Sequence, residues 1–254
     1  GYVRCMNQAM DGAARAGRQL HDAVAELTAD LKADLHDIKP KLRGWLHLGT
    51  VPLTLAAGIV LIVLSPTTTT KVGSAVFTAS ALLLFGVSAI YHTGTWSPRL
   101  WAFWRRWDHA NIFLLIAGSY TAFSLLLLHG TQREVLLATV WAGAILGVGF
   151  RIFWTDAPRW LYVPIYVALG WAAIFFIPGF YDGAIRLGVG IGIATFVMIL
   201  VGGGLYTFGG VVYGIKRPDP WPRWFGFHEV FHTFTILAFT AHFVGVSMAT
   251  FARR

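Results

Sequence analysis

The apolar residues of this chain are gathered into seven long segments, separated by shorter polar stretches. The segments cover about 44–64, 72–92, 110–128, 135–150, 160–177, 187–206 and 227–251. A helix that spans the hydrocarbon core of a bilayer needs about 20 predominantly apolar residues. The pattern therefore predicts an all-α integral membrane protein built as a bundle of seven transmembrane helices.

A different pattern precedes these segments. Between residues 20 and 38 the apolar positions recur every three or four residues, which predicts an amphipathic helix that ends at Pro40. These positions are Leu20, Val24, Leu27, Leu31, Leu35 and Ile38. We expect residues 1–43 to form an N-terminal arm, with this helix on the membrane surface or against the bundle. A regulatory or oligomerising arm stays open as an alternative, and residues 44–254 form the transmembrane domain.

The composition agrees with a membrane protein. Of the 254 residues, 56% are hydrophobic and only 13% are charged, whereas soluble domains carry about a quarter of charged residues. The net charge of +8 comes from basic residues beside the apolar segments, so it indicates membrane topology and no nucleic-acid partner. The single cysteine, Cys5, excludes an intramolecular disulfide.

Lys and Arg are distributed unevenly between the two sides of the predicted bundle. Fifteen of the twenty lie before the first segment or in the connections after the second, fourth and sixth segments. Positively charged residues are enriched in cytoplasmic connections. We therefore expect a multi-pass protein of the cell membrane with its N-terminus in the cytoplasm and its C-terminus outside.

The seventh segment opens with the sequence HExxH, which begins at His228 and ends at His232. Residues four apart lie on one face of a helix, so both imidazoles can bind one metal ion, and HExxH is the signature of zinc proteases. Glu229 follows His228 directly and points about 100° away from the shared face. We expect Glu229 to pair with Arg223 or another arginine of the cytoplasmic side.

A protease would need a third zinc ligand after HExxH. The metzincin spacing places this ligand at position 238, which is Ala238, and His242 is the only later histidine. No acidic residue follows Glu229. The sequence therefore disfavours a protease, and His92 is the better third ligand.

The order of the segments brings four ionisable residues to one membrane depth. The second segment ends at His92, the third begins next to Asp108, and the seventh begins with His228 and His232. Three imidazoles with a fourth position open to water are typical of a catalytic zinc site. Ser88 lies one helical turn from His92 on the same face. Asp108 either ligates the metal, orients a bound water or holds a histidine tautomer.

The remaining histidines and the tryptophans of the connections are less specific. We expect His47 and His129 at the membrane interface, and His242 as a hydrogen-bonded core residue. His109 is expected in solvent, with a role behind Asp108 as the alternative. The tryptophans of two cytoplasmic loops are expected to anchor the interface, or else to cover the site. They are Trp96, Trp101, Trp104, Trp107, Trp221 and Trp224.

Together these residues resemble the hemolysin III branch of the progestin and adipoQ receptor family. The resemblance covers about 44–251 and rests on Ser88-x3-His92, on the stretches 108–112 (DHANI) and 117–121 (AGSYT), and on 227–232 (FHEVFH). It implies that a zinc ion is held by His92, His228 and His232. It also implies that Asp108 meets the zinc-bound water and that Ser88 is the serine of the family motif.

The resemblance favours a hydrolase. A zinc ion in this site would lower the pKa of its bound water and polarise a carbonyl group, while Asp108 orients or deprotonates the water and Ser88 steadies the oxyanion or the water. The family is similar to alkaline ceramidases in this pattern. This similarity implies hydrolysis of a lipid amide or ester, connected with membrane lipid or fluidity homeostasis.

Two alternatives stay open. One is a non-enzymatic sensor or modulator of membrane state, of the hemolysin type, with a structural zinc. The other is a pore or transporter, which needs a polar path through the outer halves of the helices and would depend on His242. The expected partners are membrane lipids, including a lipid substrate, and a homo-oligomer stays open.

Overall fold

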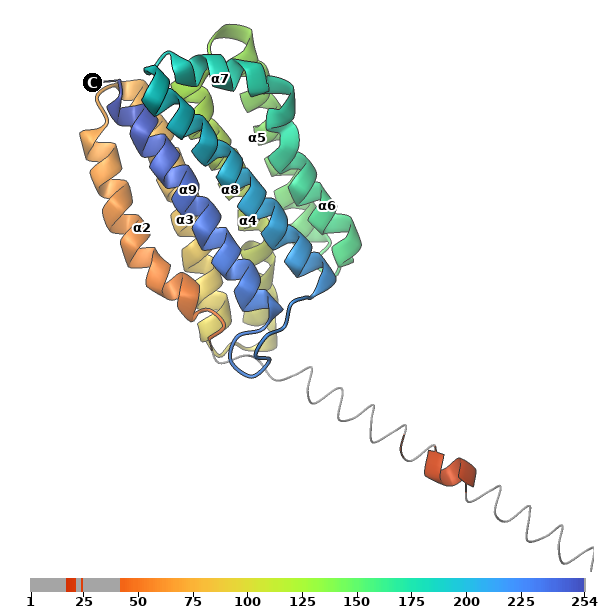
Figure 1. Cartoon of the computed structure of the whole chain (residues 1–254). Helices are drawn as coiled ribbons and strands as arrows, with labels where there is room; N and C mark the ends of the chain where they lie inside the picture. The colour runs from red at the N-terminus through yellow and green to blue at the C-terminus, as the bar shows by residue number, and fades with distance from the viewer. Residues whose placement is uncertain (1–16, 22–23, 25–41, 254) are drawn as a thin grey trace, which may run out of the picture. The chain divides into compact units, whose positions relative to one another are not determined.

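The computed structural model describes residues 17–21, 24 and 42–253, and within them seven helical spans are long and apolar enough to cross a membrane. They form one bundle (Figure 1). The elements are α2 (Trp45–Leu64), α3 (Thr68–Thr93), α4 (Pro98–Leu127), α5 (Gly130–Phe153), α6 (Arg159–Gly170), η1 (Trp171–Phe176), α7 (Ile177–Ile185), α8 (Val189–Ile215) and α9 (Phe227–Phe251). The predicted seven-helix fold is confirmed, and the protein is a multi-pass membrane protein.

Helix α4 is the central helix of the bundle. Its apolar window is 78% buried, against 17% to 28% for α2, α5, α8 and the span made by α6, η1 and α7. Small and large apolar side chains alternate on it, and Phe113, Ala117 and Ala122 are fully buried. A helix that is apolar on most of its surface belongs inside a bundle. The buried polar residues of α4, which are His109, Asn111, Ser119, Thr121 and Ser124, therefore face other helices and not lipid.

The start of α4 corrects one prediction. The helix begins at Pro98, twelve residues before the predicted segment, so Trp101, Trp104 and Trp107 lie in its first turns and not in a loop. Proline is favoured at the first helical position because its φ angle already suits the helix. The 30 residues of α4 span about 45 Å, more than the hydrocarbon core of about 30 Å. The hydrophobic pattern showed only the part inside the membrane.

The fifth span is interrupted. The α-helical hydrogen bonds of α6 stop at Gly170, and the 3-10 segment η1 leads into α7. The hydroxyl of Tyr120 on α4 donates to the Gly170 carbonyl at 2.6 Å and accepts from the Ala173 amide at 2.8 Å. Backbone groups inside a membrane need such partners, because lipid provides none. Tyr120 thus stabilises the break.

Helix α8 runs without interruption through its three successive glycines. At Gly202 a Cβ atom would lie 2.1 Å from Cδ2 of His242. Helices α8 and α9 therefore approach each other closely at this glycine, and they lie side by side (Figure 1).

The N-terminal arm is only partly described. Residues 17–21 and 24 are helical, and most of the amphipathic helix predicted between 20 and 38 lies outside the described residues. The orientation of the bundle in the membrane stays a prediction.

Candidate metal site

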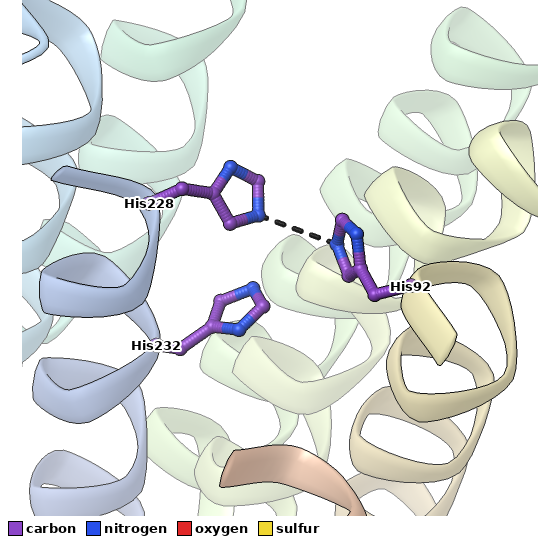
Figure 2. Close-up of side chains that lie close together, drawn as sticks. All are labelled: His92, His228 and His232. Carbon is purple, nitrogen blue, oxygen red and sulfur yellow. Dashed lines mark hydrogen bonds between the residues drawn. The ribbon is translucent and has the colours of Figure 1, made fainter. Parts of the chain in front are cut away.

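Three histidines meet at one end of the bundle. His92 lies in the last turn of α3, and His228 and His232 lie in the first two turns of α9. Because α3 ends at the level where α9 begins, the three rings face one another across the space between these helices (Figure 2). The structure thus brings together the ligand set expected from the sequence.

The distances between the ring nitrogens suit one metal ion. One nitrogen from each histidine lies within 4.8 Å of the other two, and Nε2 of His92 and Nε2 of His228 are 3.3 Å apart. Two nitrogens bound to one tetrahedral zinc at 2.0–2.1 Å are separated by about 3.3–3.4 Å. His232 is 2% exposed and its Nδ1 has no hydrogen-bond partner. The residues therefore fit a divalent metal, with zinc the default for three imidazoles.

Asp108 and Ser88 lie beside this cluster. Oδ2 of Asp108 is 3.8 Å from Nε2 of His92, and the Asp108 side chain is 12% exposed. Ser88 is buried on α3, and its Oγ makes no hydrogen bond to the described residues. Both side chains line the same cavity as His228 and His232. This arrangement places a carboxylate and a hydroxyl side by side next to the predicted metal, and their roles stay predictions.

A fourth histidine in this site was not predicted. His47 on α2 is 2% exposed, and its ring stacks on His232 with the ring centres 3.8 Å apart and the planes 19° apart. Placement of His47 at the interface is therefore wrong. A nitrogen binds metal in the plane of its own ring, so a metal on His232 lies outside the plane of the stacked His47 ring. His47 therefore fixes the His232 ring and is not a ligand in this geometry.

Glu229 of the HExxH sequence stabilises the start of α9. It is fully buried. Its Oε1 accepts from Nε of Arg43 at 2.9 Å, and its Oε2 accepts from the Gly226 amide at 2.8 Å. The sequence predicts that Glu229 pairs with Arg223 or another arginine of the cytoplasmic side, and its observed partner is Arg43. Since both carboxylate oxygens are bonded and Glu229 does not line the cavity, it does not act as the base of a protease.

The segment before α2 closes the site from the side. The Leu42 amide donates to the Trp224 carbonyl at 3.3 Å. Gly44 has a φ angle of 88°, and a Cβ atom there would lie 2.7 Å from Cβ of His92. Only glycine combines this left-handed conformation with so close an approach. The beginning of α2 is therefore a wall of the metal site.

His109 is buried behind Asp108. Its Nδ1 lies 2.9 Å from the Arg105 carbonyl and 3.6 Å from Oδ2 of Asp108, and its Nε2 lies 3.3 Å from the Tyr213 hydroxyl. The expectation of a solvated His109 is wrong, and the alternative position behind Asp108 is the one observed. Because the carbonyl must accept, Nδ1 carries the proton. His109 thus connects α4 to Tyr213 of α8.

A cavity of about 520 Å³ extends from the three-histidine cluster into the bundle. One end of the cavity is lined by Ser88, Asp108, His228 and His232. His242 also lines the cavity and lies fourteen residues after His228 on α9, which is about 21 Å along the helix. Most of the other lining residues are apolar. They include Leu84, Ile112, Leu115, Ile116, Phe123, Val163, Val167, Phe180, Phe196 and Ile199. The cavity is therefore polar at the predicted metal and apolar along most of its length.

The cavity also reaches the outer surface of the bundle. Trp171 and Ile174 of η1 and Leu200 of α8 line it, and they are 52%, 47% and 51% exposed. In a seven-helix membrane bundle this outer surface faces lipid. A lipid can therefore approach the cavity from the side, between η1 and α8.

Comparison with known proteins gives one family. The sequence profile described as haemolysin-III related matches residues 35–243. Hemolysin-3 of Bacillus cereus is 30% identical over 187 residues, which are 72% of this chain and 79% of that protein. The hemolysin-3 homolog of Bacillus subtilis (strain 168) is 31% identical over 161 residues, 63% of this chain and 69% of that protein. Progestin and adipoQ receptor-like protein 1 of Caenorhabditis elegans is 27% identical over 201 residues, 72% of this chain and 44% of that protein.

Proposed function

The chain belongs to the haemolysin-III-related family, the hemolysin III branch of the progestin and adipoQ receptor proteins, and from this premise we propose that it is a metal-dependent hydrolase of a membrane lipid amide or ester. One observation carries the proposal. A single cavity joins the three-histidine cluster, Asp108 and Ser88 to a long apolar interior. Hydrolysis of such lipids would serve membrane lipid or fluidity homeostasis.

The shape of the cavity suits an acyl chain. From His228 to His242 it follows α9 for about 21 Å, whereas one leaflet contributes about 15 Å of the hydrocarbon core. Moving an acyl chain from the bilayer into the cavity changes its hydrophobic free energy little, because both surroundings are apolar. The gain is in orientation, because a bound chain directs its carbonyl group toward the histidines.

The residues beside the cluster divide the chemistry between them. A divalent ion on His92, His228 and His232 would supply Lewis acidity and lower the pKa of water. Asp108 accepts the proton of the attacking water at its carboxylate and later returns it to the leaving amine or alcohol. The unbonded Oγ of Ser88 donates to the oxygen of the scissile carbonyl, where negative charge develops.

The test separates turnover from metal binding. Asp108→Ala removes the carboxylate but none of the three imidazoles, so metal content should stay near that of the wild type while turnover of a long-chain N-acyl amide or ester falls by at least about a hundredfold. Metal is measured by elemental analysis and product by mass spectrometry. Equal turnover in Asp108→Ala and wild type would refute this mechanism.

A non-enzymatic sensor with a structural metal is the second candidate, and the position of Asp108 favours it. Oδ2 of Asp108 lies 3.8 Å from Nε2 of His92, so a small rotation would make it a fourth ligand and close the site. This candidate predicts that Asp108→Ala loses metal together with the histidine variants. X-ray absorption of the metal-loaded protein would then show four protein ligands and no exchangeable water.

A further inference from the structure

A second group of unbonded polar atoms lies deep in the cavity, far from the three-histidine cluster. Among the described residues, six side chains that line the cavity have a buried polar atom with no hydrogen-bond partner. Three of them, His47, Ser88 and His232, belong to the metal site. The other three are Ser119 on α4, Tyr206 on α8 and His242 on α9.

Tyr206 and His242 lie next to each other in the cavity, and Ser119 lies one helical turn from the residue of α4 that packs against His242. The rings of Tyr206 and His242 are 5.5 Å apart, and the ring of Phe123 is 5.3 Å from His242. Ser119 lies one helical turn before Phe123 on α4, and therefore on the same face. Ser119 and His242 are 6% and 8% exposed. The group is thus a polar patch inside an otherwise apolar part of the cavity, which we call the deep polar subsite.

Leaving such atoms without partners is unfavourable. A buried donor or acceptor that makes no hydrogen bond costs about 1–3 kcal/mol, and buried polar side-chain atoms in folded proteins are nearly always bonded. The other polar side chains of the cavity follow this rule: Tyr120, Tyr166, Thr207 and Thr235 are all bonded to the backbone. The deep polar subsite therefore lacks a partner that a ligand can provide.

The chemistry of His242 defines this partner. Nε2 of His242 lies 3.3 Å from the Ile199 carbonyl, which only accepts, so Nε2 carries the proton and Nδ1 is an acceptor. The hydroxyls of Tyr206 and Ser119 both donate and accept. A hydroxyl group satisfies this set, because it donates to Nδ1 of His242 and accepts from Tyr206. A carbonyl group would leave Nδ1 unbonded.

We propose that the deep polar subsite binds a hydroxyl group carried along the chain of a lipid whose head lies at the three-histidine cluster. Asp108 and Ser119 are eleven residues apart on α4, which is about 16 Å along the helix. An extended chain advances about 1.2 Å per bond, so the hydroxyl belongs about twelve to fourteen bonds from the head. The ligand is thus a long-chain lipid hydroxylated near carbon 12.

The ligand class rests on the proposed function, but its test measures binding and not turnover. 12-Hydroxystearate, 2-hydroxystearate and stearate compete with a fluorescent fatty acid for the wild-type protein in nanodiscs. We expect the wild type to bind 12-hydroxystearate about fivefold to tenfold more tightly than either of the other two, the gain from one or two added hydrogen bonds. Equal affinities, as expected if water alone fills the subsite, would overturn the proposal, and so would a lack of saturable binding.

Variants assign the preference to the subsite. Tyr206→Phe and Ser119→Ala each remove one hydroxyl and should reduce the preference. The double variant should lower it below either single variant, to the part that Nδ1 of His242 alone provides, while stearate affinity stays unchanged. Ser124→Ala is the matched control, because Ser124 is a fully buried, unbonded serine of the same helix that does not line the cavity. A preference that is undiminished in the double variant, or that is lost in Ser124→Ala, refutes the subsite. If the wild-type protein prefers 12-hydroxystearate but hydrolyses no lipid amide or ester, the proposed hydrolase is refuted and the subsite is not.

Discussion

At the scale of single residues, the three-histidine cluster depends on where each ring is held. His92 is fixed by α3, and His232 is held between α9 and the stacked ring of His47. His47 itself makes no hydrogen bond. We therefore expect His47 to set the orientation of the His232 ring, and we expect metal affinity to come from the three imidazoles that face one another.

A pair of substitutions separates these two roles. His92→Ala removes one of three ligands and should lower metal content by at least about tenfold, since three-coordinate protein sites depend on each ligand. His47→Phe keeps a flat ring against His232 and should retain metal close to one ion per chain. Elemental analysis of the purified proteins is the measurement. Metal loss in His47→Phe to the level of His92→Ala would instead make His47 a ligand.

At the scale of elements, the first turn of α9 is held by the start of α2. Glu229 bonds the Gly226 amide, which caps α9, and pairs with Arg43 across 186 positions of sequence. A charge at this depth is stable only while it is paired and hydrogen-bonded. The HExxH glutamate thus stabilises the helix that presents His228 and His232.

This assignment predicts a loss of stability. Glu229→Gln retains an acceptor for the Gly226 amide but loses the ion pair, and should destabilise the protein by about 1–3 kcal/mol, less than for a fully buried pair because the Arg43 side chain is 23% exposed. Thermal unfolding in detergent measures the change, and Glu134→Gln on the surface of α5 is the control. An unchanged Tm together with lost turnover would contradict a structural role and return Glu229 to catalysis.

At the scale of the whole molecule, the cavity reaches the outer surface between η1 and α8, and we expect a lipid to enter it there. Gly203 and Gly204 line the cavity on α8, and a Cβ atom at either would meet no atom within 4 Å. The break between α6 and α7, stabilised by Tyr120, forms the opposite wall. A side chain added at these glycines would therefore occupy the opening without disturbing the packing of the helices.

Gly204→Leu tests this route. The added side chain should slow the association of a fluorescent fatty acid several-fold, while Tm is unchanged or raised because glycine weakens a helix interior by about 0.5–1 kcal/mol. Gly86→Leu is the control, since Gly86 on α3 also has open space around its Cβ position but does not line the cavity. Stopped-flow fluorescence provides the rates. Equal association rates in the two variants would place the route elsewhere.

The sequence by itself determined the membrane bundle and the three-histidine set. Long apolar segments specify spanning helices through a local property, and the order of those segments places His92, His228 and His232 at one depth. The tertiary structure alone decided the partner of Glu229, the stack of His47 on His232 and the deep polar subsite. These features arise where side chains from distant helices pack against one another, and neither hydrophobic period nor motif spacing records which faces meet.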